Sequence, residues 1–266
     1  MHCQVLSSGS EGNSTLIRAG ETTLLVDGGL VVREQRARMQ AAGLGPKALD
    51  HVLVTHGHLD HARSTGAIAR KEEATLHCAE RMMRNRSVRR APRMSTITIG
   101  RTMELVRGEP GLFQEGETVR VLPVLLPHDC DPTVGYRIEQ KGRVVVILTD
   151  IGRPDAEVAR ALQGAHVLVL EFNHDLERMA GSEYPPALQK RITSDRGHLS
   201  NQQAAHMLEL LAGPELHTLV LAHLSKRTNT PELALAEARQ ALARIGREDV
   251  RLVVASQDEI GENLAV

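Results

Sequence analysis

One short segment restricts what this chain can fold into more than any other: residues 55–61, which read Thr-His-Gly-His-Leu-Asp-His. The segment follows directly on residues 51–54, a short apolar run that predicts a buried strand. Alternating histidines at the end of a strand can point both imidazoles the same way, and a turn into a helix lets the aspartate and the last histidine face a second point nearby. The segment therefore predicts a site for two metal ions, with four candidate ligands: His56, His58, Asp60 and His61.

Composition alone can also produce a histidine-rich surface loop, so the context of the segment matters. Four residues of ligand type within six positions, with a strand before them and a helical pattern after them, favour a metal site. A dinuclear hydrolytic centre needs about three protein ligands per metal ion, so further ligands have to come from other strand ends. His128, Asp150 and His223 each stand at the end of a predicted strand. Their alternative roles are, in turn, a turn residue, a helix cap and a buried neutral imidazole.

Composition and charge limit the other possibilities. No Pro/Ser-rich linker or charge run splits the 266 residues, so we expect a single domain over residues 1–266. The net charge of −1 and the pI near 6.9 exclude a global basic field, so any contact with nucleic acid has to be local. Three cysteines without a recurring spacing argue against a disulfide scaffold and indicate a reducing cytoplasm. With neither a secretory signal pattern nor a membrane-length apolar run, we expect a soluble cytoplasmic protein.

The hydrophobic pattern predicts strands and helices that alternate as in an α/β layer, with two runs of strands that would form two sheets. Strands are expected at 3–6, 15–18, 23–26, 51–54, 75–78, 103–106, 118–126, 133–139, 143–148, 166–170, 218–221 and 250–254. Helices are expected at 30–42, 62–71, 154–162, 186–192, 200–211 and 231–245, with Ser200 or Asn201 as a cap. Turns are expected at Glu115-Gly116 and Lys141-Gly142.

Positive charge is concentrated between Arg81 and Arg93, where six arginines occur without an acidic residue. Arginine binds phosphate oxygens through two parallel hydrogen bonds, so this run is either a phosphate-binding surface or a solvated helix face. Rings on which bases could stack are few, because the chain lacks tryptophan and its Phe and Tyr residues are limited to Phe113, Tyr136, Phe172 and Tyr184.

The His-x-His-x-Asp-His pattern after a hydrophobic strand resembles the signature of the metallo-β-lactamase fold, a four-layer αββα sandwich of the α/β (α+β) class. Four more segments are similar to the YycJ (or WalJ) branch of that superfamily, which is related to tRNase Z. They are SSGSEGNST at 7–15, EFNHD at 171–175, SDRGHLSN at 194–201 and HLSKR at 223–227. The similarity extends over almost the whole chain. For this branch it implies activity like that of a 5′→3′ exonuclease.

The resemblance also implies a set of metal ligands. It assigns one metal ion to His56, His58 and His128, the other to Asp60, His61 and His223, and a bridging position to Asp150. Asp60 can in addition orient the attacking hydroxide, which makes it a catalytic residue. Asp27, after the third strand, would support the site from behind the ligands, or else is only a turn residue. Two divalent ions are therefore expected, of zinc, manganese or iron.

Glu171 and His198 occupy positions that resemble the Glu/His pair of tRNase Z, in which the histidine donates a proton to the leaving alkoxide and the glutamate keeps it protonated. The alternatives are a surface carboxylate for Glu171 and a helix-capping loop residue for His198. Candidate contacts to a substrate phosphate come from the small-residue loop at 8–13 and from the loops after two later strands. They are Asn13, His174, Ser225, Lys226 and Arg227.

These inferences favour a metal-dependent phosphodiesterase, in the first place a 5′→3′ DNA exonuclease that uses a hydroxide activated by two metal ions. A small-molecule hydrolase of the same fold (cyclic phosphodiesterase, lactonase or thioesterase) and an RNA-processing nuclease stay open, because one metal site polarises carbonyl and phosphoryl oxygens alike. A partner-binding protein that keeps metal ions for structure is disfavoured by the full ligand set. The sequence leaves the metal, the polarity of digestion and the oligomeric state open, with a homodimer among the alternatives.

Overall fold

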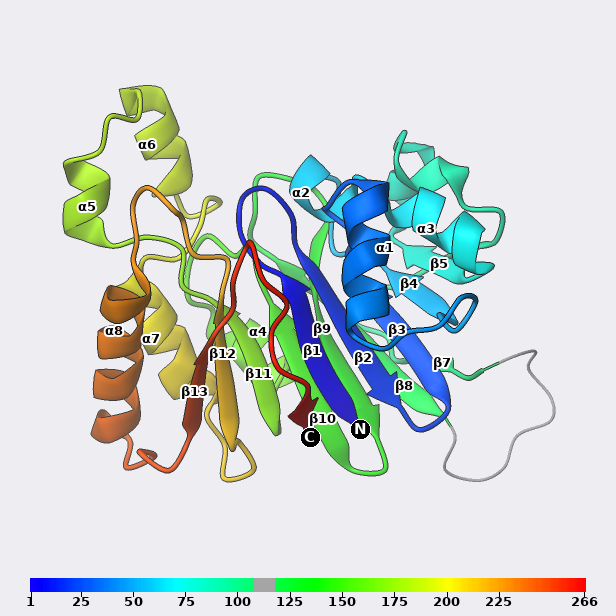
Figure 1. The fold of residues 1–266 in the computed structure, drawn as a ribbon. Coiled ribbons are helices and arrows are strands. Elements are labelled where there is room, and N and C mark those ends of the chain that lie inside the picture. The colour runs from blue at the N-terminus through cyan, green and yellow to red at the C-terminus, as the bar shows by residue number, and fades with distance from the viewer. Residues whose placement is uncertain (108–117) are drawn as a thin grey trace. The chain divides into compact units, whose positions relative to one another are not determined.

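The computed structural model describes residues 1–107 and 118–266, and it contains two sheets of seven strands each (Figure 1). The predicted turn at Glu115-Gly116 and the ring of Phe113 lie outside the described residues. Contacts between Cα atoms divide the chain into two compact units. Unit 1 comprises Met1–Pro123, Ile138–Val144 and Ser256–Val266, and unit 2 comprises Val124–Arg137 and Val145–Ala255. The expected α/β class is confirmed, and the single domain stays a prediction.

The first sheet lies in unit 1 and has the strand order β14-β1-β2-β3-β4-β5-β6. Its strands are β1 (His2–Ser7), β2 (Ser14–Ala19), β3 (Thr22–Val26), β4 (His51–Leu53), β5 (Thr75–Cys78), β6 (Met94–Thr96) and β14 (Leu264–Ala265). Strands β1 to β3 pair antiparallel, whereas β3, β4, β5 and β6 pair parallel. Val26 lies opposite Leu53, so the carboxyl ends of β3 and β4 meet at one edge of this sheet.

Helices α1 (Val32–Ala41) and α3 (Thr65–Glu72) pack on this sheet together with the short turns η1 (Glu80–Arg84) and η2 (Val88–Arg90). Met39 and Ile68 of the helices join Leu25 and Val52 of the strands in one apolar cluster. The helix predicted at 62–71 is interrupted, because a first turn, α2 (Leu59–Ala62), ends before α3. At the interruption Ser64 bonds to the segment after β3 instead of continuing the helix: its backbone N–H donates to Gly28 O, and its hydroxyl donates to Leu30 O.

The second sheet has the order β13-β12-β11-β10-β9-β8-β7. Its strands are β7 (Met103–Leu105), β8 (Val119–Leu126), β9 (Thr133–Gln140), β10 (Arg143–Leu148), β11 (Val167–Glu171), β12 (Thr218–Ala222) and β13 (Arg251–Val254). Strands β8, β9 and β10 contribute residues to both units. Strands β10 to β13 are parallel, with Leu148 opposite Leu170 and Glu171 opposite Ala222. Three strand ends therefore meet at one edge, the usual place for a site in a parallel sheet.

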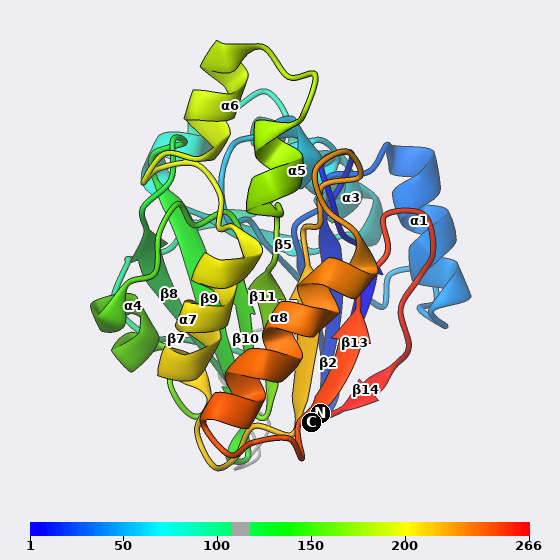
Figure 2. The ribbon, with the colours of Figure 1, turned by 90° about the vertical axis from the view of Figure 1, so that its left-hand side faces the viewer.

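The helices of unit 2 are α4 (Ala156–Ala161), α5 (Leu176–Ala180), α6 (Pro186–Ile192), α7 (Asn201–Leu211) and α8 (Pro231–Arg244). Helices α7 and α8 lie side by side along the parallel strands (Figures 1 and 2). Ser200 caps α7 in a capping box with Gln203, as one of the two expected caps. Asp155 caps α4, so Asp150 does not serve as that cap.

The hydrophobic pattern did not predict α5, β6, β14 or the turns η1 and η2. These elements have two to five residues, which is too short for a period of 2.0 or 3.6 residues to be recognised. Strand β14 exists because the chain end pairs with His2 and Cys3. In the part of the chain that the structure describes, no helix combines the length and the apolar character that crossing a bilayer requires.

Candidate active site

The histidine motif begins two residues after β4 and runs into α2 at the edge where β3 also ends. His56 and His61 are fully buried, whereas His58 and Asp60 are partly exposed. His56 Nε2 lies 3.0 Å from His58 Nδ1, and the ring centroids of His56 and His61 are 4.2 Å apart. His61 Nε2 lies 3.7 Å from the Asp60 carboxylate. Unit 1 therefore brings all four ligand candidates of the motif together.

Asp27, directly after β3, organises this cluster. Its Oδ1 accepts from the backbone N–H of Thr55 at 2.8 Å, and its Oδ2 accepts from Thr55 Oγ1 and His61 Nδ1, each at 2.7 Å. Because the carboxylate holds the proton on Nδ1, the lone pair of the His61 ring is on Nε2, the atom that a metal ion would take. Asp27 adopts φ +61°, a conformation that costs a non-glycine residue strain energy and often marks functional sites.

Asn13 lies beside His61 with its side chain buried. Its amide oxygen accepts from Gly9 N–H, and its amide nitrogen donates to Gly9 O and lies 2.9 Å from His61 Nε2. Asn13 N–H also donates to the carbonyl oxygen of Asp60, which holds the loop of Asn13 close to the motif. Gly29 packs against the same oxygen: a Cβ on Gly29 would lie 1.7 Å from it. Asn13 thus has a structural role, and its predicted contact with substrate stays a prediction.

Unit 2 gathers a second cluster at the carboxyl ends of β10, β11 and β12, which place Asp150, Glu171 and His223. His128 follows β8, and His198 precedes α7. Asp150 Oδ1 lies 3.7 Å from each of three ring nitrogens: His128 Nε2, His198 Nδ1 and His223 Nε2. Asp150 and His223 have φ values of +62° and +55°, so this cluster, like Asp27, includes strained backbone.

The donor set of unit 2 fits a divalent metal ion. His128 Nδ1–H donates to Gly197 O at 2.9 Å, which puts the lone pair on Nε2, facing the carboxylate oxygens of Asp129 (3.3 Å) and Asp150 (3.7 Å). Burial lowers the pKa of His128, so a proton does not readily fill the space between these acceptors. Ligands that hold a zinc-sized ion at about 2.1 Å lie roughly 3.4 Å from each other, close to the spacing found here.

Glu171 is a buried acceptor rather than a surface carboxylate, with no exposed area. Its Oε1 accepts from Leu199 N–H at 2.7 Å, and its Oε2 accepts from Asp150 N–H at 2.9 Å and from His198 Nδ1–H at 3.1 Å. His198 keeps part of its surface exposed, and it does not cap α7. Gly197 holds it in place, since a Cβ there would lie 2.1 Å from Ile192 O. The structure therefore brings the predicted Glu/His pair into direct contact.

The remaining predicted contacts lie in the loops after β11 and β12. His174 is buried, its backbone pairs with Ser200, and burial lowers its pKa to about 4. Ser225 Oγ accepts from Thr228 N–H. Lys226 and Arg227 are exposed. His174 thus closes a loop, whereas the two basic residues keep surface for a ligand.

The arginine segment between Arg81 and Arg93 belongs to unit 1 and forms η1 and η2. All six arginines are exposed, and Asn85 Nδ2–H donates to Gly57 O at 3.4 Å. The segment therefore lies next to the histidine motif, which the sequence did not predict. The helical part of the segment consists of two turns of five and three residues, and phosphate binding by its arginines stays a prediction.

Sequence reasoning missed several supporting residues. Thr55 joins Asp27 to the motif, and Asn173 Nδ2 donates to His223 O. Asn201 and Asn229 exchange two amide hydrogen bonds of 2.9 Å, and Asn229 also donates to Phe172 O. Thr55, Asn173 and Asn201 lie inside the motif segments already singled out, so their position was the available signal. Asn229 had none.

Comparison with known proteins relates the chain to one superfamily. Residues 22–224 match the family described as "Beta-lactamase superfamily domain". Exodeoxyribonuclease YycJ of Bacillus anthracis is 30% identical over 246 residues, which cover 92% of this chain and 90% of that protein. Ribonuclease Z of Mycobacterium bovis is 32% identical over 164 residues, 52% of this chain and 56% of that protein. The metallo-β-lactamase fold protein YhfI of Bacillus subtilis has a similar structure, with a TM-score of 0.69, 14% identity and coverage of 99% and 98%.

Proposed function

We propose that this chain, which belongs to the metallo-β-lactamase superfamily and is a hydrolase of it, is a phosphodiesterase. Its proposed reaction is the removal of nucleotides from DNA in the 5′→3′ direction. The resemblance stated from the motifs is confirmed by the match over residues 22–224. The observation that carries the proposal is the hydrogen bond between His198 and the buried Glu171. A histidine held in this way is a proton donor suited to an alkoxide leaving group. The 30% identity to an exodeoxyribonuclease over most of both chains supports the choice of DNA.

For the cofactor we propose two divalent ions, zinc or manganese, with the ligands that the sequence predicted. When bound, one ion would be held by His56, His58 and His128 and the other by Asp60, His61 and His223, with Asp150 as the ligand shared by both. Support comes from each unit separately: the contacts among the motif side chains in unit 1, and the three ring nitrogens around Asp150 Oδ1 in unit 2. When bound, such a pair of ions supplies a hydroxide at neutral pH and neutralises charge that builds on phosphorus.

Each of the residues around the proposed metal ions then has its own role in the reaction. Asp60 would orient the hydroxide that a bound metal pair supplies, and Asp27 keeps the proton of His61 on Nδ1. Glu171 accepts from His198 Nδ1–H, so the proton for the leaving oxygen comes from His198 Nε2. Glu171 also accepts hydrogen bonds from the backbone N–H groups of Asp150 and Leu199. The same carboxylate therefore holds the His198 ring and the backbone of Asp150.

Substrate contacts are proposed for the basic residues that keep exposed surface. Lys226 and Arg227 follow His223 on the same loop, with Ser225 beside them. Asn13 and His174, the other two predicted contacts, are buried, and their contact with substrate stays a prediction. The six exposed arginines between Arg81 and Arg93 provide a local positive surface for a phosphate backbone, despite the net charge of −1. The three cysteines without a recurring spacing fit a protein of the reducing cytoplasm.

The test is a gel time course on DNA labelled at the 5′ or the 3′ end, single-stranded and duplex, with manganese or zinc added. Asp60→Ala serves as the blank, and an RNA strand of the same sequence runs in parallel. Stepwise shortening from the 5′ end that the blank lacks is the expected result. Shortening of RNA alone would favour an RNA-processing nuclease, in keeping with the similarity to ribonuclease Z. Intact nucleic acid with hydrolysis of bis-nitrophenyl phosphate would instead favour a small substrate.

A further inference from the structure

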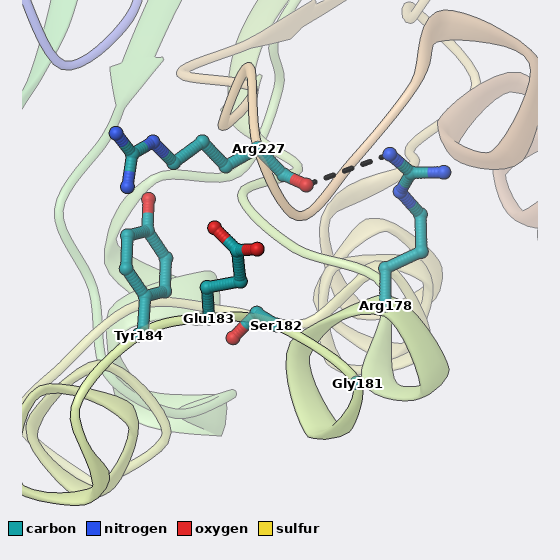
Figure 3. A pocket seen from close by; sticks show the side chains of 6 residues that line it. All are labelled: Arg178, Gly181, Ser182, Glu183, Tyr184 and Arg227. Carbon is teal, nitrogen blue, oxygen red and sulfur yellow. Dashed lines mark hydrogen bonds between the residues drawn. The ribbon is translucent and has the colours of Figure 1, made fainter.

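Unit 2 contains an open pocket of about 550 Å³ that none of the predicted metal ligands lines (Figure 3). Its walls come from α5, from the segment between α5 and α6, and from the loop after β12. The lining residues are Arg178, Gly181, Ser182, Glu183, Tyr184 and Arg227. The volume falls in the range of about 300–1,000 Å³ that is usual for small-ligand sites. Of these residues, sequence reasoning had proposed only Arg227 as a substrate contact.

Two arginines provide the positive charge of the pocket. Arg178 Nη2 donates to Arg227 O at 3.5 Å, which connects α5 to the loop after β12. The guanidinium carbon of Arg227 lies 5.5 Å from the centroid of the Tyr184 ring (Figure 3). Both side chains are exposed. Within the described ranges neither guanidinium forms an ion pair with a carboxylate, so both remain able to bind an anion. Arginine donates in the planar, two-pronged geometry that matches phosphate oxygens.

Tyr184 provides an aromatic surface that is rare in this chain. Tyr136 and Phe172 are fully buried, so among the described residues Tyr184 is the only Phe or Tyr with accessible ring surface. Nucleobases of any sequence stack on such rings, and an arginine over the ring adds to the stack. A ring and two guanidinium groups in one pocket match the two chemical parts of a nucleotide.

Glu183 limits how much negative charge the pocket can hold. In the view of Figure 3 its carboxylate lies between the side chains of Tyr184 and Arg178. A carboxylate repels phosphate oxygens at close range, which disfavours a ligand with several adjacent phosphates. A single phosphodiester group can contact the arginines while the base covers the ring. Nucleoside triphosphates fit this charge pattern less well than one residue of a strand.

We propose that the pocket formed by Arg178, Tyr184 and Arg227 binds one nucleotide residue of a single-stranded nucleic acid, with its phosphate at the two arginines and its base against Tyr184. The proposal rests on the proposed function for the identity of the ligand. It adds Arg178 and Tyr184 as residues that bind substrate away from the predicted metal ligands. Their removal should weaken binding of a strand.

The experiment measures binding of a fluorescein-labelled ten-nucleotide DNA strand by anisotropy, on an Asp60→Ala background so that the strand is not degraded. Tyr184→Ala should weaken binding about 5- to 150-fold, as expected for loss of one stacked base, whereas Tyr184→Phe should keep most of it. Arg178→Ala should weaken binding and flatten its salt dependence. Arg239→Ala is the matched control, an exposed arginine on α8, and should bind like the parent.

An abasic strand, in which every nucleotide lacks its base, separates the contribution of base stacking to binding from that of the phosphate charge. Tyr184→Ala should bind this abasic strand as well as the parent does, whereas Arg178→Ala should still bind it less well. Equal binding of the normal strand by the parent, Tyr184→Ala and Arg178→Ala would overturn the pocket proposal without contradicting the proposed nuclease function. If the parent binds no strand and the protein with Asp60 intact hydrolyses only bis-nitrophenyl phosphate, both proposals fail.

Discussion

Each of the two units gathers candidate site residues at the carboxyl ends of strands, but the two clusters arise in different ways. In unit 1, four ligand candidates come from six consecutive residues after one strand, β4. In unit 2, Asp150, Glu171 and His223 come from three strand ends, and His128 and His198 from two further loops. Both use the carboxyl ends of parallel strands, which bring distant residues to one edge. One cluster is local in sequence, and the other exists only after the sheet has formed.

Strain marks both clusters. Asp27, Asp150 and His223 are three of the six described non-glycine residues with positive φ, and all three follow strand ends. A backbone conformation that costs of order 1–3 kcal/mol persists only where the surroundings hold it in place. Asp27 is held by Thr55 and His61, and Asp150 by Glu171. Strain therefore indicates function at the dispersed cluster, where sequence spacing is uninformative.

A third group of histidines in unit 1 shows what burial without carboxylates produces. His51 Nε2–H donates to Val106 O at 2.9 Å, so its Nδ1 accepts from His77 Nε2–H at 3.1 Å. Neither ring is within ion-pair distance of a carboxylate in the described part of the chain. Burial lowers the pKa of both rings, that of His77 to about 3. This pair is a neutral structural contact, in contrast to the carboxylate-linked histidines of the two clusters.

The largest expected effect sharpens the role of unit 2. Replacement His198→Ala should lower the rate of DNA hydrolysis about 10²- to 10⁴-fold, because the alkoxide then leaves without a proton donor. Hydrolysis of bis-nitrophenyl phosphate should fall far less, since nitrophenolate leaves unprotonated. Steady-state kinetics on both substrates makes the comparison, and Asp60→Ala should lose both. Equal losses on the two substrates would remove His198 from the acid role.

An intermediate effect tests the support of the motif in unit 1. Replacement Asp27→Asn removes the charge that orients the His61 ring, so metal affinity or activity should fall about 10- to 100-fold. Competition with a chromogenic chelator measures the affinity. Asp50→Asn is the matched control, because Asp50 also accepts a backbone N–H, that of Thr23, without contacting the motif. Unchanged affinity in Asp27→Asn would reduce Asp27 to a turn residue.

The smallest effect concerns stability and uses the His51–His77 pair. The folded-state pKa of His77, about 3, lies below its ordinary 6.5, so the unfolded chain binds the proton first as the pH falls. The contribution of the unprotonated His77 to the free energy of unfolding is complete above pH 6.5 and is lost progressively down to about pH 3. At pH 5 the loss should be about 2 kcal/mol, from 1.36 kcal/mol per pH unit.

Replacement His77→Gln should remove this part of the pH dependence. Thermal unfolding followed by circular dichroism at pH 8 and pH 5 measures it, and the wild type should lose more Tm between the two values than the variant. At pH 8 the histidine is neutral in both states, so that measurement isolates the structural cost of the replacement. The same drop in Tm for both proteins would show that His77 is protonated alike in the folded and unfolded states.

Prediction from sequence succeeded where the information was local. The strands at 23–26 and 51–54 and the motif that follows them are adjacent in the chain, and they recur with small shifts of their ends in the structure. His128, Asp150 and His223 could be predicted as metal ligands because polar residues at the ends of apolar runs are visible in the pattern, and their role as ligands stays a prediction. The elements that escaped prediction, such as β14 and α5, are short and depend on partners far away in the chain.

The sequence by itself determined the superfamily, the two runs of strands and the ligand types, because apolar periodicity and the spacing of histidines and aspartates are local properties. Only the tertiary structure decided that Asp27 orients His61, that Glu171 joins Asp150 to His198, and that Tyr184 shares a pocket with Arg178 and Arg227. These contacts link residues up to 49 positions apart. Hydrogen bonds and packing at such separations follow from strand register and loop closure, which no local pattern encodes.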